Sequence, residues 1–367
     1  MTAATKQTIY VGGYTHGKNR DGIFLYDLDV DTGRLKLRRA VDGIADPSFL
    51  AVGPDRRCLL AVSEGTEFDD EPGGGVRAYA IDRESGNLSA LNGQPTHGEH
   101  PCYVSFDHSG QWAFVANYSS GSLTMFPVRE NGLLGGPSVV IRHHGHSVAS
   151  ERQEGPHVHS VQVDPDNRRL FVVDLGLDEI IAYPLDLTSG RLDSTTPVVT
   201  RTAPGAGPRH ICFHPNGRFV YVSNELDSTV SAYTFDRDTG HLALLQTLST
   251  RPEGYKQYND AADIHLSPDG RFLFVSNRGH DSLAGFAVDA ESGQLTLGGH
   301  TKARGHWPRN FGFDATGNFI LVANQKSDNL VSFRFDPASG ALEYTGHQVE
   351  VPEPACVLAV ASKAALA

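Results

Sequence analysis

The sequence predicts an all-β fold, a seven-bladed β-propeller built from four-stranded antiparallel blades. One phrase recurs along the chain: an acidic residue, three variable positions, glycine, one variable residue and leucine. Clear copies begin at Asp29, Asp82, Asp186, Asp236, Asp289 and Asp336, and a degraded copy begins at Arg129. The first and last copies lie 307 residues apart (336 − 29), which gives six intervals of about 51 residues. A repeat of that length, made of strands and turns without a sustained helical period, is typical of a propeller.

Each repeat opens with a short apolar strand, often behind a proline. These first strands are predicted at PSFLAV from Pro47, PCYVSF from Pro101, PRHICF from Pro208, PRNFGF from Pro308 and PACVLAV from Pro354, with HSVQV from His159 and ADIHL from Ala262 in the same slot. A turn follows, such as HPNGR from His214, where proline and glycine supply the backbone angles that a hairpin needs.

The other three strands follow in a fixed order. The second is a continuous apolar run, as in RFVYVSN, and the third alternates more clearly, as in STVSAYTFD. The Asp-to-Gly phrase then turns the chain into a fourth, outer strand. Apolar runs of both kinds, bounded by turn residues, indicate strands.

The two ends of the chain are out of phase with the repeat. The N-terminus begins in the second-strand slot with TIYVGGYT, and the C-terminus ends just after the first-strand segment PACVLAV. Joined, these ends complete a seventh blade, shared by residues 8–41 and 353–362. We therefore expect a single domain over residues 1–367, with its ring closed by the N- and C-terminal strands, because closure leaves no open sheet edge.

Composition narrows the classes of partner. The chain has 367 residues, 39% of them hydrophobic, and 39 glycines, which suits a turn-rich β fold with ample core. It opens with no charged and apolar leader and holds no run of membrane-spanning length, so we expect a cytoplasmic protein without a membrane partner. The formal charge of −12 argues against nucleic acid. Monomer and dimer both remain open.

Neither the cysteines nor a histidine-rich segment has the spacing of a metal site. Cys58, Cys102, Cys212 and Cys356 form no CxxC pair, so they are expected to be free buried thiols. Residues 142–160 include five histidines but no HExxH pattern. We expect no metal and no other cofactor; neutral histidines there suit hydrogen bonding or proton relay.

Chemically active residues gather at one face of the predicted ring. Because successive strands are antiparallel, the start of each first strand and the end of each second strand lie on the same face. Strand starts carry His157, His159, Arg209, His210, Asp263, His265 and Arg309, and strand ends carry Glu64, Asn117, Glu225, Asn277, Arg278, Asn324 and Gln325. Insertions at 65–75, 137–156 and 251–261 belong to this face and would wall a funnel at the central channel.

Each of these residues also has an ordinary structural explanation, since asparagine at a strand end often caps a turn. Structure alone gives no reason, however, for equivalent positions of a repeat to differ in charge. Glu225 and Arg278 hold matched positions in adjacent blades and differ in this way. We therefore predict a binding site in the funnel, with a bound substrate surrounded by His157, His210, Asn117, Asn277, Arg309 and Gln325.

With the blades placed, the chain resembles the bacterial cycloisomerase-type 6-phosphogluconolactonases. This family of seven-bladed propeller lactonases includes fungal 3-carboxy-cis,cis-muconate lactonizing enzymes. The resemblance runs from IYVGGYT to PACVLAV, and its most specific segments are GPHVHS, GPRHI, SNEL, SNRGHDS and ANQKSDN. It implies a catalytic histidine, two arginines and a glutamate, which by position are His159, Arg209, Glu225 and Arg278.

The resemblance implies a hydrolase that opens a small anionic lactone, above all 6-phospho-D-glucono-1,5-lactone to 6-phosphogluconate. A guanidinium in a dry pocket could stabilise the oxyanion of the tetrahedral intermediate, and Glu225 or His159 could take a proton from water. No GxSxG elbow is present, which favours direct attack by water. Arginines in an acidic protein fit a phosphate on the substrate.

Other functions remain open on the sequence. A cycloisomerase that forms a lactone from a carboxymuconate-type acid would use the same face, as would a lactonase for an unphosphorylated lactone, because carboxylate and phosphate both attract arginine. A non-catalytic propeller that binds a protein would expose aromatic anchors there, whereas the predicted funnel carries mainly His, Arg, Asn and Glu.

Overall fold

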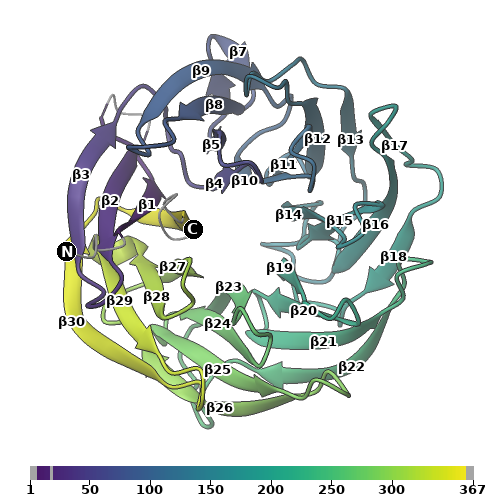
Figure 1. Cartoon of the computed structure of the whole chain (residues 1–367). Helices are drawn as coiled ribbons and strands as arrows, with labels where there is room; N and C mark the ends of the chain where they lie inside the picture. The colour runs from purple at the N-terminus through teal and green to yellow at the C-terminus, as the bar shows by residue number, and fades with distance from the viewer. Residues whose placement is uncertain (1–5, 17–19, 361–367) are drawn as a thin grey trace.

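The chain forms a closed ring of seven antiparallel sheets around a central axis (Figure 1). The computed structural model describes residues 6–16 and 20–360. Within these residues the secondary structure is strand apart from one 3₁₀ turn, η1 Gln325–Ser327, and no helix has the length and apolar character needed to cross a membrane. The predicted all-β, seven-bladed propeller is confirmed.

Each blade contributes one strand to each of four positions, numbered outward from the axis. The innermost strands are β4 Leu50–Val52, β10 Pro101–Phe106, β14 Val158–Val163, β19 Pro208–Phe213, β23 Asp260–Leu266, β27 Pro308–Phe313 and β31 Pro354–Val360. The second strands are β5 Cys58–Ser63, β11 Trp112–Asn117, β15 Arg169–Asp174, β20 Phe219–Asn224, β24 Phe272–Arg278, β28 Phe319–Asn324 and β1 Lys6–Gly13.

The third strands are β8 Gly75–Ile81, β12 Ser122–Pro127, β16 Glu179–Asp186, β21 Thr229–Phe235, β25 Ser282–Val288, β29 Asn329–Phe335 and β2 Ile23–Asp29. The outer strands are β9 Leu88–Pro95, β13 Val139–Arg142, β18 Val198–Arg201, β22 Leu242–Ser249, β26 Leu295–Lys302, β30 Leu342–Glu350 and β3 Leu35–Val41. Short additions are β6 Glu67–Phe68, β7 Glu71–Pro72 and β17 Arg191–Leu192. β13 occupies the first part of the insertion predicted at 137–156, so the inserted loop there is shorter than expected.

The two ends of the chain close the ring by strand pairing. β1 pairs with β31 in antiparallel register from Thr8 opposite Val360 to Gly13 opposite Pro354. Figure 1 shows the yellow C-terminal strand beside the purple β1. The predicted sharing of one blade is therefore observed, although residues 361–362 of its predicted range lie outside the described residues, as do 1–5, 17–19 and 363–367 of the expected domain. We infer a single domain from this closure.

The recurring phrase has two physical causes. In the copy that begins at Asp289, the carboxylate Oδ1 accepts backbone N–H bonds from Glu291 at 3.1 Å and Ser292 at 2.7 Å, which closes the turn. Gly293 then adopts a φ of +72°, and a Cβ there would lie 2.3 Å from the ring of Phe219 in the preceding blade. Glycine is therefore required both for the backbone angle and for the close packing of neighbouring blades.

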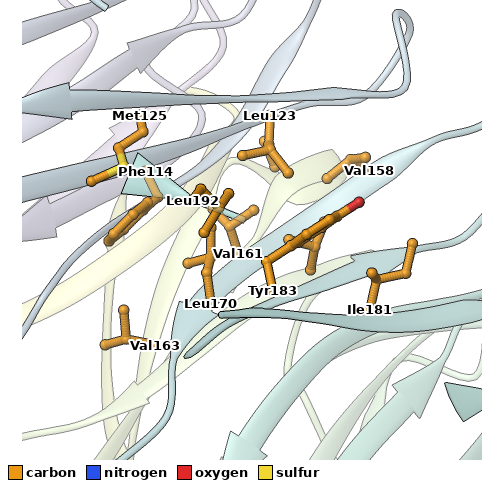
Figure 2. Close-up of a cluster of buried hydrophobic side chains, with 12 residues drawn as sticks. Phe114, Leu123, Met125, Val158, Val161, Val163, Leu170, Ile181, Tyr183 and Leu192 are labelled. Carbon is orange, nitrogen blue, oxygen red and sulfur yellow. The ribbon is translucent and has the colours of Figure 1, made fainter. Parts of the chain in front are cut away.

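The hydrophobic core lies between blades. Figure 2 shows one such cluster, in which Phe114 and Met125 of one blade pack against Val161, Leu170 and Tyr183 of the next. All five are at most 5% exposed, and full burial of a side chain of this kind stabilises the fold by about 1.5–3 kcal/mol. Hydrophobic contacts between neighbouring blades therefore stabilise the ring, and polar side chains can lie around the central axis.

Candidate active site

A β-bulge near the start of four inner strands supplies one side chain each to the funnel. In these strands the register skips a residue just after the strand begins, and the skipped residues are Cys102, His159, Arg209 and Arg309. A bulged residue has no partner opposite it, so its side chain leaves the regular alternation of the strand. The repeated bulge therefore places chemically different groups at equivalent positions around the axis.

The ends of the second strands form the rest of the wall. Six of the seven residues at these ends line one cavity of about 360 Å³: Tyr14, Glu64, Tyr118, Glu225, Arg278 and Gln325. The bulge residues Cys102, His159 and Arg309 line it as well. Loops complete it with Arg152 and Tyr258, from two of the predicted insertions, and with Trp307; Asp260, the first residue of β23, lies beside them.

Glu225 is the electrostatic centre of this cavity. Its Oε1 lies 2.5 Å from Arg152 Nη2, and its Oε2 lies 2.7 Å from Arg278 Nη2 and 2.9 Å from Arg209 Nε. The two contacts to Oε2 are close ion pairs without the alignment of hydrogen bonds. Burial alone would raise the pKa of Glu225, but the surrounding arginines, led by Arg278 and Arg209, hold it well below its ordinary value. Glu225 is therefore an anion that organises cations.

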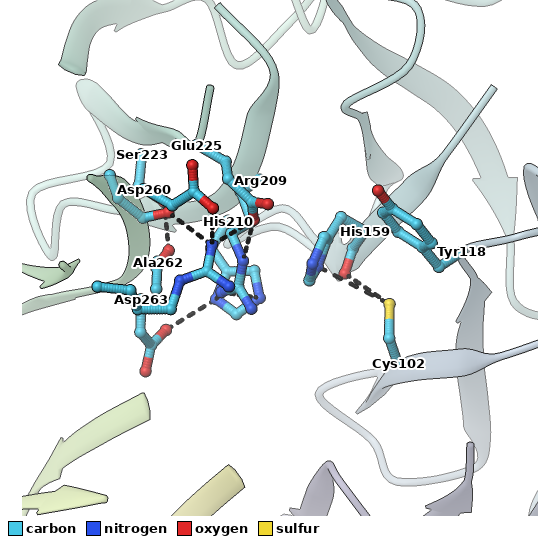
Figure 3. Close-up of polar contacts among 12 residues, drawn as sticks. Cys102, Tyr118, His159, Arg209, His210, Ser223, Glu225, Asp260, Ala262 and Asp263 are labelled. Carbon is cyan, nitrogen blue, oxygen red and sulfur yellow. Dashed lines mark hydrogen bonds and ion pairs between the residues drawn. The ribbon is translucent and has the colours of Figure 1, made fainter. Parts of the chain in front are cut away.

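Arg209 is held from below by a polar network in the channel (Figure 3). Its Nη1 lies 3.1 Å from Nε2 and 3.4 Å from Nδ1 of His210. The two distances are similar, so the guanidinium stacks over the imidazole face. His210 Nδ1 lies 2.8 Å from Asp263 Oδ1, and the other carboxylate oxygen accepts from Asn310 at 2.6 Å and pairs with His265 at 2.9 Å. Burial, together with Arg209, lowers the pKa of His210 to about 4, so the imidazole under the Arg209 guanidinium is neutral.

His159 lies beside this network, and its ring makes an edge contact with the ring of His210 at 5.2 Å between centroids. Its Nδ1 lies 3.8 Å from Cys102 Sγ, and its ring makes an edge contact with Tyr118 at 5.5 Å between centroids (Figure 3). Burial and then the charge of Arg209 hold the pKa of His159 well below its ordinary value, so the imidazole is neutral. His157 lies behind the wall, stacked on Tyr118 at 4.5 Å, with Nδ1 3.1 Å from the Tyr118 carbonyl oxygen.

Arg309 differs from the other three arginines because no carboxylate of the described residues pairs with it within 4.0 Å. Its guanidinium lies 5.5 Å from the centroid of the Tyr14 ring. Burial acts to lower its pKa, but Tyr14 and Glu64 outweigh that effect and raise it, so the group stays charged. Glu64 is itself held by the Tyr14 hydroxyl, which donates to its Oε2 at 2.9 Å. Arg309 is thus a cation that faces the cavity and makes no hydrogen bond or ion pair with another residue of the part of the chain that the structure describes.

The structure brings together most, but not all, of the predicted site. His159, Glu225, Arg278, Arg309 and Gln325 line the cavity, and Arg209 lies directly behind Glu225. His157 and His210 support the wall from outside the cavity.

Asn117 and Asn277 differ from the prediction. Asn117 Nδ2 donates to Ser122 Oγ at 3.1 Å, and Asn277 Nδ2 donates to the carbonyl of Thr250 at 2.7 Å. Both side chains are fully buried. They hold the turns of their own blades, because the residue that reaches the cavity is the next one along the chain.

Several cavity residues had no place in the predicted set: Tyr14, Tyr118, Arg152, Tyr258, Asp260 and Trp307. Tyr14 and Tyr118 occupy the repeat position of Glu225, so strict alignment of the repeats would have identified them. Arg152 and Tyr258 lie in predicted insertions, but nothing in the sequence indicates which loop residue turns inward.

The histidine-rich segment separates into buried and exposed parts. His143 pairs with Asp174 at 2.7 Å and with the Tyr183 hydroxyl at 3.0 Å, while His144 and His146 are exposed. Within residues 6–16 and 20–360, no three His, Cys, Asp or Glu side chains are arranged to hold a metal ion. All four cysteines are free thiols; Cys58, Cys102 and Cys356 are buried as predicted, whereas Cys212 is partly exposed.

Comparison with known proteins identifies the family. A family model described as "Lactonase, 7-bladed beta-propeller" matches residues 8–359. The 6-phosphogluconolactonase of Bacillus subtilis (strain 168) is 37% identical over 315 residues, 85% of this chain and 86% of that protein. The 6-phosphogluconolactonase of Formosa agariphila is 36% identical over 310 residues, 83% of this chain and 86% of its own. The solved structure of a periplasmic gluconolactonase from Pseudomonas aeruginosa is 38% identical, with a TM-score of 0.91 over 98% of this chain and 100% of that one. The chain belongs to the seven-bladed β-propeller lactonases.

Proposed function

We propose that this protein hydrolyses 6-phospho-D-glucono-1,5-lactone to 6-phosphogluconate, with water as the direct nucleophile. The proposal agrees with the names of two relatives that are 37% and 36% identical to it. It places the substrate in the cavity around Glu225. A cytoplasmic location and the absence of nucleic-acid and membrane partners stay predictions from the sequence, and one similar structure is described as periplasmic.

The observation that carries the proposal is the charge of the cavity. Three guanidinium groups, those of Arg152, Arg278 and Arg309, line the cavity together with three carboxylates, those of Glu64, Glu225 and Asp260, and a fourth guanidinium, that of Arg209, lies directly behind Glu225. With all of them ionised the net charge is +1, although the whole chain carries −12. Arg309 has no carboxylate partner among the described residues, so we assign it to the phosphate, which a guanidinium binds with two parallel hydrogen bonds.

The chemistry of the wall favours water as the nucleophile. No serine or threonine of the described residues lines the cavity, and its one cysteine is Cys102. Burial raises the pKa of the Cys102 thiol, with Glu64 adding to the effect, so the reactive thiolate is disfavoured. We assign Arg278 to the carbonyl oxygen, because a fixed guanidinium in a buried site stabilises the oxyanion of the tetrahedral intermediate.

A second candidate substrate is the unphosphorylated glucono-1,5-lactone. The 38% identical structure from Pseudomonas aeruginosa is described as a gluconolactonase. The two lactones present the same ester to the enzyme and differ in charge at the far end. The preference between the two lactones therefore depends on whether Arg309 binds the substrate.

The test is a direct comparison of the two lactones with the purified protein, corrected for spontaneous hydrolysis and run with and without a chelator. One charged hydrogen-bonded contact contributes about 1.5–3 kcal/mol, so kcat/KM for the phosphorylated lactone should be higher by roughly 10- to 100-fold. The chelator should change neither rate. Equal values, or a preference for glucono-1,5-lactone, would contradict the phosphorylated substrate while leaving the lactonase assignment intact.

A further inference from the structure

We infer that Asp260 is the catalytic general base, which takes the proton from the attacking water; the inference rests on the proposed hydrolysis of a lactone. Asp260 lies at the start of β23, directly opposite Arg278 in the strand register, and its side chain lines the cavity. Figure 3 shows its carboxylate beside Glu225. The sequence led us to expect Glu225 or His159 as the proton acceptor, and neither has the contacts that this role requires.

Glu225 is unsuited because both of its oxygens are already engaged. Arg152 lies against Oε1, and Arg209 and Arg278 lie against Oε2, all within 2.9 Å. A proton transferred to Oε1 would break the ion pair with Arg152, and one transferred to Oε2 would break the pairs with the buried guanidinium groups of Arg209 and Arg278. Such a carboxylate is a weak base and a strong organiser of positive charge.

His159 is unsuited for the opposite reason. It is neutral, and the imidazolium formed on accepting a proton would lie buried near Arg209, His210 and Arg309, whose effect together with burial outweighs the attraction of Glu225. The like charges of the two arginines oppose that state, as does the loss of hydration. His159 remains a hydrogen-bonding group for the substrate.

Asp260, by contrast, has one carboxylate oxygen that can accept a proton from water. The contacts that the described residues make with its carboxylate all fall on Oδ2: a hydrogen bond from the Tyr258 hydroxyl, and Arg278 Nη2 and Arg152 Nη1 at 3.8 and 4.0 Å. Oδ1 is left to accept from a water molecule in the cavity. Burial, followed by the negative charge of Glu225, raises the pKa of Asp260, while Arg278, Tyr258 and Arg152 act in the other direction. A carboxylate with a raised pKa is the stronger base.

The reaction balances with this single group. Asp260 Oδ1 accepts one proton of water as the water oxygen bonds to the lactone carbonyl carbon, and the carbonyl electrons move to an oxygen held by Arg278. When the intermediate collapses, the bond from the carbonyl carbon to the ring oxygen breaks. The protonated Asp260 returns its proton to that ring oxygen, which becomes the free hydroxyl of the product. The enzyme is regenerated, and the sum is lactone plus water giving the hydroxy acid.

The experiment measures kcat and KM for 6-phosphogluconolactone from acidic to neutral pH in the wild type, Asp260→Asn and Asp260→Ala. Without the base, kcat should fall by about 10²–10⁴-fold, while KM changes only a few-fold. The acidic limb of the kcat profile, where the wild type loses rate as Asp260 is protonated, should disappear. Added formate should restore part of the rate of Asp260→Ala, because a small carboxylate can occupy the space and accept the proton.

Asp227→Asn is the matched control. Asp227 is a half-buried carboxyl on the adjacent blade whose pKa is raised to about 6, mainly by burial, and it does not line the cavity. Its variant should keep the wild-type kcat, acidic limb and indifference to formate. A loss of rate in Asp227→Asn as large as that in Asp260→Asn would overturn the specific role of Asp260.

Tyr258→Phe keeps the inference testable even if the Asp260 variants do not fold. The Tyr258 hydroxyl stabilises the ionised carboxylate, so its removal should raise the pKa of Asp260 and move the acidic limb to higher pH. An unmoved limb would overturn the assignment, as would wild-type kcat and an intact limb in Asp260→Asn. In either case an active wild type would leave the proposed function standing. A wild type that opens neither lactone would overturn both.

Discussion

Glu225 and Arg278 hold equivalent strand ends in neighbouring blades, and their side chains meet in an ion pair 2.7 Å long. One position of the repeat thus contributes to a single site, because its residues in neighbouring blades carry opposite charges and face one another across the boundary between the two blades. Arg152 and Arg209 pair with the same carboxylate, so one buried anion holds three cations, of which Arg209 and Arg278 are buried and Arg152 is partly exposed.

The first prediction concerns stability. Glu225→Gln leaves three arginines without their counter-charge in a site where the Glu225 side chain is 4% exposed. Breaking a buried pair in this way costs about 3–5 kcal/mol, so the melting temperature should drop by several degrees. Glu64→Gln is the control, because Glu64 holds the same repeat position but accepts hydrogen bonds from Tyr14 and Ser48 in place of arginine ion pairs. An equal loss in both variants would contradict the central role of Glu225.

The same pair predicts a pH dependence. The pKa of Glu225 is lower in the folded protein than its ordinary value, so its contribution to stability is complete above about pH 4.5. That contribution is lost as the pH falls through the folded pKa. The difference in unfolding free energy between wild type and Glu225→Gln should therefore shrink on acidification. A difference that is constant over the acid range in urea titrations would be inconsistent with the ion pairs.

The channel network predicts an effect on rate without direct contact with substrate. His210 supports the guanidinium of Arg209, whereas His265 binds the same Asp263 carboxylate without touching Arg209. His210→Gln should lower kcat by about tenfold, equivalent to roughly 1.4 kcal/mol, while His265→Gln keeps it. Steady-state kinetics on both variants, with melting curves as a check on folding, decides the matter. Equal losses in kcat in the two variants would contradict a role that depends on the contact between His210 and Arg209.

The repeat glycines predict a graded loss of stability. Gly293→Ala forces a side chain into a positive φ and places a Cβ 2.3 Å from Phe219. The strained angle costs about 1–2 kcal/mol and the overpacking about 1–3 kcal/mol more. Gly43 has a φ of +79° with nothing within 4 Å, so Gly43→Ala should lose only the first amount. Urea unfolding of the two variants measures the difference, and equal losses would remove the packing explanation.

Ring closure predicts that the last strand is indispensable. Removal of residues 353–367 deletes β31 and exposes the inner edge of β1, which pairs with it from Thr8 to Gly13. An exposed edge of this kind favours aggregation, so the shortened protein should lose cooperative unfolding. A melting curve like that of the full chain would show that closure is unnecessary.

The sequence predicted the blades, their order and the face that carries the site, because each depends on a pattern repeated seven times. It did not reveal the bulges that turn Cys102, His159, Arg209 and Arg309 toward the axis, since a bulge depends on strand pairing and has no sequence mark here. Asn117 was predicted at the site in place of Tyr118 for a different reason: Tyr118, one residue further on, is the residue that aligns with Glu225 in the repeat. Asp260 was missed because β23 begins earlier than the apolar run that predicted it.

Substitution of Arg309 tests the account most directly, because Arg309 is the cation assigned to the phosphate. The measurement is the ratio of kcat/KM for 6-phosphogluconolactone to that for glucono-1,5-lactone, in the wild type and in Arg309→Met. Arg304→Met serves as the control, because Arg304 is exposed and packs over Tyr344 away from the cavity. We predict that Arg309→Met lowers the ratio by roughly 10- to 100-fold and keeps activity on the unphosphorylated lactone, while the control is unchanged. A ratio unaffected by Arg309→Met would contradict the phosphorylated substrate and the role of Arg309 together.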